Sequence, residues 1–236
     1  MIDVYEALAF CGEHFPEGPE RLAERLGASV EYHPLDGCEG WCVQGDAGVI
    51  IRINSSSPLT RQRFTLAHEL AHLLLHTAPD VEILVELGCP VDDEERSVNN
   101  LAAQMLLPSQ VMIELVTSLP IPRRDILAIA AKARSSDAVV AQRIVQMKGQ
   151  LGIANAFFAE FRESNFWVSP AFACPPPRVR ELLTKAKAAY PNDYEYEHIG
   201  RQNSVAIFET PWSTTMLVQS VKPNTALASA YSPDSD

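Results

Sequence analysis

The segment RFTLAHELAHLLLH, residues 63–76, constrains the fold of this chain most, because three histidines stand four residues apart in an otherwise apolar run. Residues four apart lie on one face of an α-helix. Ser57 fits the N-cap and Pro58 the first helical position, so we expect a helix over about 58–76. Apolar residues at helical spacing form its buried side: Phe64, Ala67, Leu70, Ala71 and Leu74.

Within this helix, His68, Glu69 and His72 form an HExxH motif. The two imidazoles can converge on one ion at about 2.0–2.1 Å. Glu69 lies about 100 degrees around the helix from His68, where it can reach an attacking water without ligating the metal. The alternative is a pair of surface or core histidines. Two imidazoles buried side by side without a shared partner would be costly, so the metal site is the favoured interpretation.

A third ligand has to come from another element, because a catalytic zinc takes three protein ligands and keeps one position open. His76 is a poor choice, since its Cα lies about 12 Å along a straight helix from that of His68. The chain also lacks the spacing that returns a third histidine after a glycine turn. We expect His76 to end the helix or to support the ligands.

Glu95 is the predicted third ligand. It begins the next expected helix, on the side shared with Val98, Ala102 and Leu106. Glu94 is the fallback, whereas Asp92 and Asp93 need only the favourable field of a helix N-terminus.

The stretches RQRFTLAHELAHLLLH and ERSVNNLAAQMLLP together resemble the ImmA/IrrE family of zinc-dependent metallopeptidases, over residues 40–110. In that family a strand ending in Asn leads to the HExxH helix, and a second helix reads E-x-x-A-N-x-F-A-x-x-L-L-x-P. The resemblance implies that His68, His72 and Glu95 are metal ligands and that Glu69 is the catalytic carboxylate. This chain departs from the pattern at Val98 and Leu101, two apolar changes that concern packing.

The resemblance also implies a function: cleavage of a helix-turn-helix transcriptional repressor, in a stress response or on a mobile element. The ligand set suits Zn²⁺ and can also accept Mn²⁺ or Fe²⁺. His76 and Arg63 are candidates for stabilising the oxyanion. Two alternatives stay open, a non-cleaving module that sequesters a repressor or toxin, and a DNA-binding regulator.

The DNA-binding alternative depends on residues 121–150, which carry six basic and two acidic residues and can form two helices with a turn. We favour helices that complete the peptidase core. The net charge of −11 also argues against a broad nucleic-acid surface.

The expected fold class is α+β: a zincin-like, mainly helical core with a small β-sheet, plus a smaller C-terminal α+β domain. The expected boundaries are 1–148 for the metallopeptidase domain, with helix-turn-helix-like helices at 121–148, and 150–222 for a small domain of unknown role. A disordered tail is expected over 223–236. No membrane segment or secretory signal is recognised, and five scattered cysteines suit a reducing cytoplasm. Cys38 and Cys42 are expected to be free thiols rather than half of a metal site.

Overall fold

In the computed structural model, the described residues are 2–45, 48–77, 94–162, 165–168, 195–197, 203–209 and 214–221. The chain divides into two compact units. The first comprises Met1–Leu115 and Leu127–Arg143, and the second Val116–Ile126 and Ile144–Asp236. Seven helices and two sheets occur among the described residues, which confirms a mixed α+β class. None of these helices combines the length and apolar character needed to cross a membrane.

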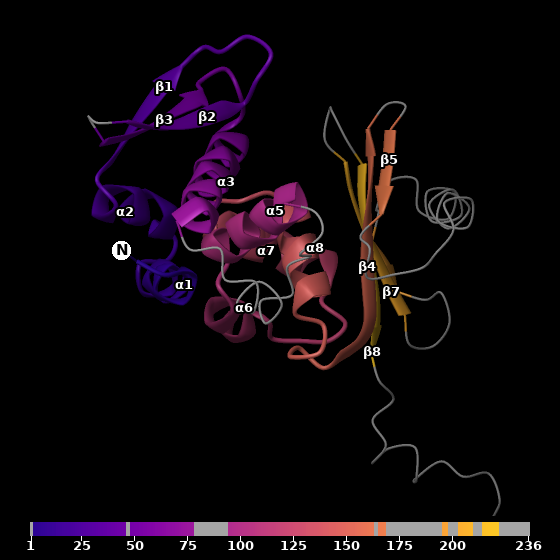
Figure 1. Ribbon diagram of the computed structural model, residues 1–236. Coiled ribbons are helices and arrows are strands. Elements are labelled where there is room, and N and C mark those ends of the chain that lie inside the picture. The colour runs from indigo at the N-terminus through magenta and orange to yellow at the C-terminus, as the bar shows by residue number, and fades with distance from the viewer. Residues whose placement is uncertain are drawn as a thin grey trace, which may run out of the picture. The chain divides into compact units, whose positions relative to one another are not determined.

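The first unit begins with two short helices and a three-stranded sheet (Figure 1). The side chain of Asp3 accepts a hydrogen bond from the Glu6 amide and so caps α1. The sheet has the order β1-β3-β2, with β1 parallel and β2 antiparallel to β3. The bounds are Val4–Glu13 for α1, Gly18–Arg25 for α2, Ala28–His33 for β1, Gly40–Gly45 for β2 and Gly48–Asn54 for β3.

Helix α3, Leu59–Thr77, is the long helix predicted from the histidine segment. It lies between the small sheet, which it contacts through β2 and β3, and helix α5, Glu94–Leu106 (Figure 1). The helix starts one residue later than predicted. The Ser57 hydroxyl donates to Glu39 at 2.6 Å, and the Pro58 carbonyl accepts from the backbone amides of the first turn.

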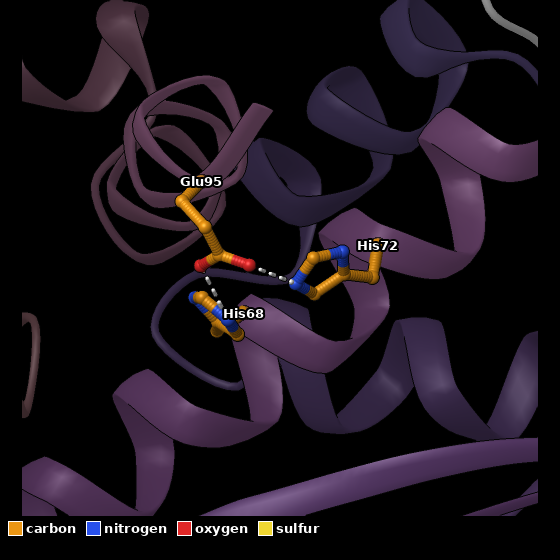
Figure 2. A group of neighbouring side chains, drawn as sticks. All are labelled: His68, His72 and Glu95. Carbon is orange, nitrogen blue, oxygen red and sulfur yellow. Dashed lines mark ion pairs between the residues drawn. The ribbon is translucent and has the colours of Figure 1, made fainter. Parts of the chain in front are cut away.

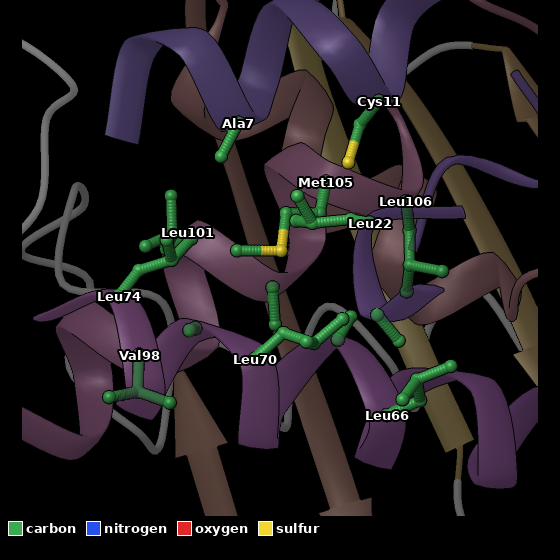
Figure 3. Close-up of a cluster of buried hydrophobic side chains, with 14 of the residues drawn as sticks. Ala7, Cys11, Leu22, Leu66, Leu70, Leu74, Val98, Leu101, Met105 and Leu106 are labelled. Atoms are coloured by element: carbon green, nitrogen blue, oxygen red, sulfur yellow. The ribbon is translucent and has the colours of Figure 1, made fainter. Parts of the chain in front are cut away.

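The buried side of α3 packs into the core of the first unit (Figure 3). Four of the five predicted apolar residues are at most 2% exposed, and Phe64 packs against the core from its edge. Helix α5 contributes Val98 and Leu101, both fully buried, so the two departures from the family pattern fill this core. Each such side chain stabilises the fold by about 1.5–3 kcal/mol. The core therefore fixes α3 against α5, the two helices that carry the predicted ligands.

Three further helices follow: α6, Ser109–Leu115; α7, Arg123–Lys132; and α8, Asp137–Gln146. In α8, Val139 belongs to the core cluster, and Arg143 is 2% exposed. Its guanidinium donates to the Leu107 carbonyl at 2.8 Å and to the Ser109 hydroxyl at 2.9 Å. These are contacts of a helix that completes the first unit. The helix-turn-helix interpretation of residues 121–148 stays a prediction.

The second unit contains an antiparallel sheet of order β5-β4-β8-β7-β6. Within this unit, the side chain of Gln219 accepts from the Ile121 amide at 3.1 Å and donates to its carbonyl at 2.8 Å. Residues 169–194 and the tail 223–236 lie outside the described residues, so the α+β domain at 150–222 stays a prediction. The strand bounds are Ile153–Arg162 for β4, Asn165–Val168 for β5, Glu195–Glu197 for β6, Asn203–Glu209 for β7 and Thr214–Val221 for β8.

Candidate metal centre

His68 and His72 are neighbours on one face of α3. Their ring centroids lie 4.8 Å apart in an edge-to-face arrangement. Their side chains are 21% and 22% exposed, so both are largely but not fully shielded from solvent. Burial lowers the pKa of His68 below its ordinary value, and the neighbouring His72 adds to this effect. His68 is therefore held in the neutral form that binds metal ions.

Glu95 reaches these two rings from the first turn of α5 (Figure 2). One carboxylate oxygen lies 3.7 Å from His68 Nε2, and the other lies 3.4 Å from His72 Nε2. The three groups offer ligand atoms that all lie within 4.8 Å of one another. Ligands of a tetrahedral zinc ion are about 3.3–3.4 Å apart, given bonds of about 2.0–2.1 Å. Small side-chain movements would bring these donors to that spacing, so the residues present fit a zinc-sized ion.

Asn99 fixes the orientation of His68. Its Oδ1 lies 3.1 Å from His68 Nδ1, and an amide oxygen can only accept, so the ring nitrogen donates. The proton on Nδ1 leaves the lone pair on Nε2, the atom that faces Glu95. A partner of this kind sets the tautomer of a metal-binding histidine. Sequence reasoning assigned no role to Asn99, although it stands four residues after Glu95 and so shares its side of α5.

Glu69 is 9% exposed and lies beside His68 in the chain. Burial, and then the charge of Glu95, raises the pKa of Glu69 to about 7. A carboxyl group with a pKa near neutrality can accept and return a proton under ordinary conditions. Burial raises the pKa of Cys42, on β2, and the charge of Glu69 adds to this shift.

His76 belongs to a different group from His68. Its Nε2 lies 3.9 Å from an oxygen of Glu94, and its ring stacks on that of His72 with centroids 6.0 Å apart. His72, His76 and Glu94 form a second set of possible metal ligands. The structure therefore brings Glu95 to the HExxH pair and places Glu94 beside the end of the helix.

Arg63, a candidate oxyanion donor in the sequence, has different surroundings. The Arg63 guanidinium donates to both carboxylate oxygens of Glu20, at 2.6 and 3.0 Å. It also donates to three backbone carbonyls, those of Pro16, Ala133 and Arg134. Because these hydrogen bonds hold the Arg63 guanidinium within the fold, we do not propose Arg63 as the oxyanion donor.

Cys38 and Cys42 are both free thiols. Among the described residues, neither belongs to a group that could hold a metal ion.

The fold and the site together define a class, an α+β protein in which two packed helices bring two histidines and a glutamate to a candidate metal centre. Residues 23–145, just over half of the chain, match the model of peptidase family M78, the IrrE N-terminal-like domain. The chain belongs to this family, which confirms the resemblance seen in the sequence and indicates a metallopeptidase.

Further comparisons add the fold of one solved structure. A transcriptional regulator from Mycobacterium tuberculosis is 15% identical, with a TM-score of 0.59 over 98% of this chain and 81% of that chain. At this identity the likeness concerns the fold alone. No curated protein matches the chain significantly.

Proposed function

We propose that this protein is a zinc-dependent metallopeptidase that hydrolyses a peptide bond in a specific protein partner, a helix-turn-helix transcriptional repressor. The observation that carries the proposal is the convergence of His68, His72 and Glu95 beside the buried Glu69. Membership of the peptidase family supports the reaction type. We assign this activity to the domain predicted over residues 1–148.

His68, His72 and Glu95 are the proposed ligands. Two neutral imidazoles and one carboxylate are a set that zinc accepts in hydrolases, and Mn²⁺ or Fe²⁺ are alternatives. When bound, such an ion polarises the scissile carbonyl and makes a nearby water more acidic. Asn99 holds the proton on Nδ1 of His68 and so keeps Nε2 available.

Glu69 is the proposed general base. It accepts a proton from the attacking water as the new C–O bond forms, and it returns a proton to the leaving amine as the C–N bond breaks. Its burial favours this role, because the carboxyl group is shielded from competing bulk water. Proton transfer by a positioned side chain contributes about 10²–10⁴-fold to a rate.

The repressor is proposed from the family and not from the solved neighbour, which supports the fold alone. Release of transcription by removal of a repressor would make this chain a regulator in a stress response or on a mobile element. Small helix-turn-helix proteins encoded beside its gene are the first substrates to test.

The test uses metal-loaded full-length protein, its Glu69→Gln variant and, as a control, Glu13→Gln, the same change at an exposed helical site. Each is incubated with the candidate repressors, and the intact masses of the products are measured. We expect cleavage by the wild type and by the control, and none by Glu69→Gln, which still binds metal. Cleavage by Glu69→Gln at the wild-type rate would refute the assigned base. Stable capture without cleavage by the wild type would instead support a binding module.

A further inference from the structure

The two ring nitrogens of His72 face two different carboxylates. Its Nε2 lies 3.4 Å from an oxygen of Glu95, and its Nδ1 lies 3.9 Å from an oxygen of Glu94. The same Glu94 oxygen lies 3.9 Å from His76 Nε2. His72 therefore takes part in both groups of ligand atoms that lie within 4.8 Å of one another.

We propose that His76, Glu94 and Nδ1 of His72 form a second divalent-cation site, which binds zinc more weakly than the first and competes with it for His72. This inference rests on the proposed function, because it takes His68, His72 and Glu95 as the primary site. It explains the third histidine of the segment, which the proposed reaction does not use.

The chemistry of the two sites is the same, two imidazoles and one carboxylate, but their surroundings differ. The carboxylates are almost equally exposed, 67% for Glu95 and 66% for Glu94. The histidines are not: His68 is 21% exposed and bonded to Asn99, whereas His76 is 71% exposed. An exposed side chain loses more conformational freedom when it is fixed on an ion. The second site is therefore the weaker one.

The two sites compete for His72 because its neutral imidazole ring has only one lone pair that can bind a metal ion. A neutral imidazole carries one proton and one ligating lone pair. When His72 serves the first ion through Nε2, its Nδ1 holds the proton and cannot ligate. For Nδ1 to ligate the second ion, the proton must move to Nε2, which removes His72 from the first ion. An ion at the second site is otherwise left with His76 and Glu94.

Excess zinc is therefore expected to disturb the primary centre. At low concentration the ion fills the first site, where the donors are better fixed. As the zinc concentration rises, an ion bound by His76 and Glu94 competes for His72. Loss of His72 as a ligand weakens binding at the first site. The structure thus predicts that a peptidase active with one zinc is inhibited by a second.

The experiment titrates metal-free, full-length protein with Zn²⁺ by calorimetry and with Co²⁺ by visible absorption. We expect two binding steps, the second about 10–100-fold weaker because Asn99 orients a ligand of the first site, and a change in the Co²⁺ spectrum of the first site as the second fills. His76→Ala and Glu94→Gln should each weaken the second step by at least ~10-fold and alter the first by less than ~3-fold. His33→Ala is the matched control: this histidine of β1 is also exposed, at 56%, and should keep both steps.

A wild-type titration with one step only, or a second step that survives both His76→Ala and Glu94→Gln, overturns the second site while the proposed function stands. Failure of the function has a different signature. If the proposed function is wrong, the first zinc-binding step is absent from the wild type or survives in His68→Ala. The second site then fails together with the proposed function.

Discussion

Replacing Asn99 by leucine should weaken metal binding without removing a ligand. The Asn99 oxygen lies 3.1 Å from Nδ1 of His68. Because the His68 side chain is only 21% exposed, water can only partly replace Asn99 as the hydrogen-bond acceptor. In the variant the His68 ring proton can occupy Nε2. A protonated Nε2 has no lone pair left to bind a metal ion beside Glu95. Loss of such a partner typically costs 10–100-fold in metal affinity. We therefore expect a loss of about 1.4–2.7 kcal/mol in binding free energy.

The assay is a competition titration of metal-free protein against a chromophoric chelator near neutral pH. Asn99→Asp keeps an acceptor oxygen and should bind within ~3-fold of the wild type, because a carboxylate serves the same purpose. Asn100→Ala is the neighbouring control. It removes an amide oxygen that accepts from Gln142 at 2.8 Å, so it should lower stability by about 1 kcal/mol and leave metal affinity unchanged.

Two results would contradict this reasoning. If Asn99→Leu binds zinc within ~2-fold of the wild type, the hydrogen bond does not orient His68. If Asn100→Ala weakens binding as much as Asn99→Leu does, the effect comes from a general loosening of α5.

Three further predictions concern packing, a thiol and the metal. Gly40→Ala would place a Cβ 2.7 Å from the Arg52 carbonyl oxygen and should destabilise the fold by about 1–3 kcal/mol in urea unfolding, whereas Gly45→Ala meets nothing within 4 Å and should cost less than ~1. Burial raises the pKa of the Cys11 thiol from 9.0 to about 12. Between these two pH values only the unfolded chain loses the thiol proton, so the free energy of unfolding falls as pH rises. At pH 8, iodoacetamide should label the exposed Cys38 and spare the buried Cys11. Zinc at about 100 times its Kd should raise the free energy of unfolding by about 2.7 kcal/mol, and a chelator should reverse this shift in a thermal melt.

The elements with local signals were predictable from the sequence. The helix expected at 58–76 is observed as Leu59–Thr77. Its apolar residues keep helical spacing over five turns, a pattern that a β-strand would not show. The pairing of β1 with β3 was not predicted. These strands are separated along the chain by β2 but lie parallel and adjacent, and such nonlocal pairing has no signature in either strand alone.

The candidate site was predictable to the same degree. His68 and His72 share a helix face by spacing alone, and Glu95 was selected because it stands on the apolar side of its own helix. The hydrogen bond of Asn99 was missed, because it depends on how α5 docks on α3 and on the rotation of one ring. The grouping of His76 with Glu94 was missed for the same reason. The roles of these residues in binding and catalysis stay predictions until they are measured.

The bonds of Arg63 bear on how this protein can be shortened for crystallisation or engineering. This one guanidinium, 12% exposed, joins the histidine-bearing helix to Glu20 upstream and to the carbonyls of Ala133 and Arg134 downstream. A fragment cut before Ala133 would strip two acceptors from a largely buried cation, although it would keep every proposed ligand. We therefore expect the smallest stable fragment that keeps the proposed ligands to extend past residue 134, well beyond Glu95, the last of those ligands.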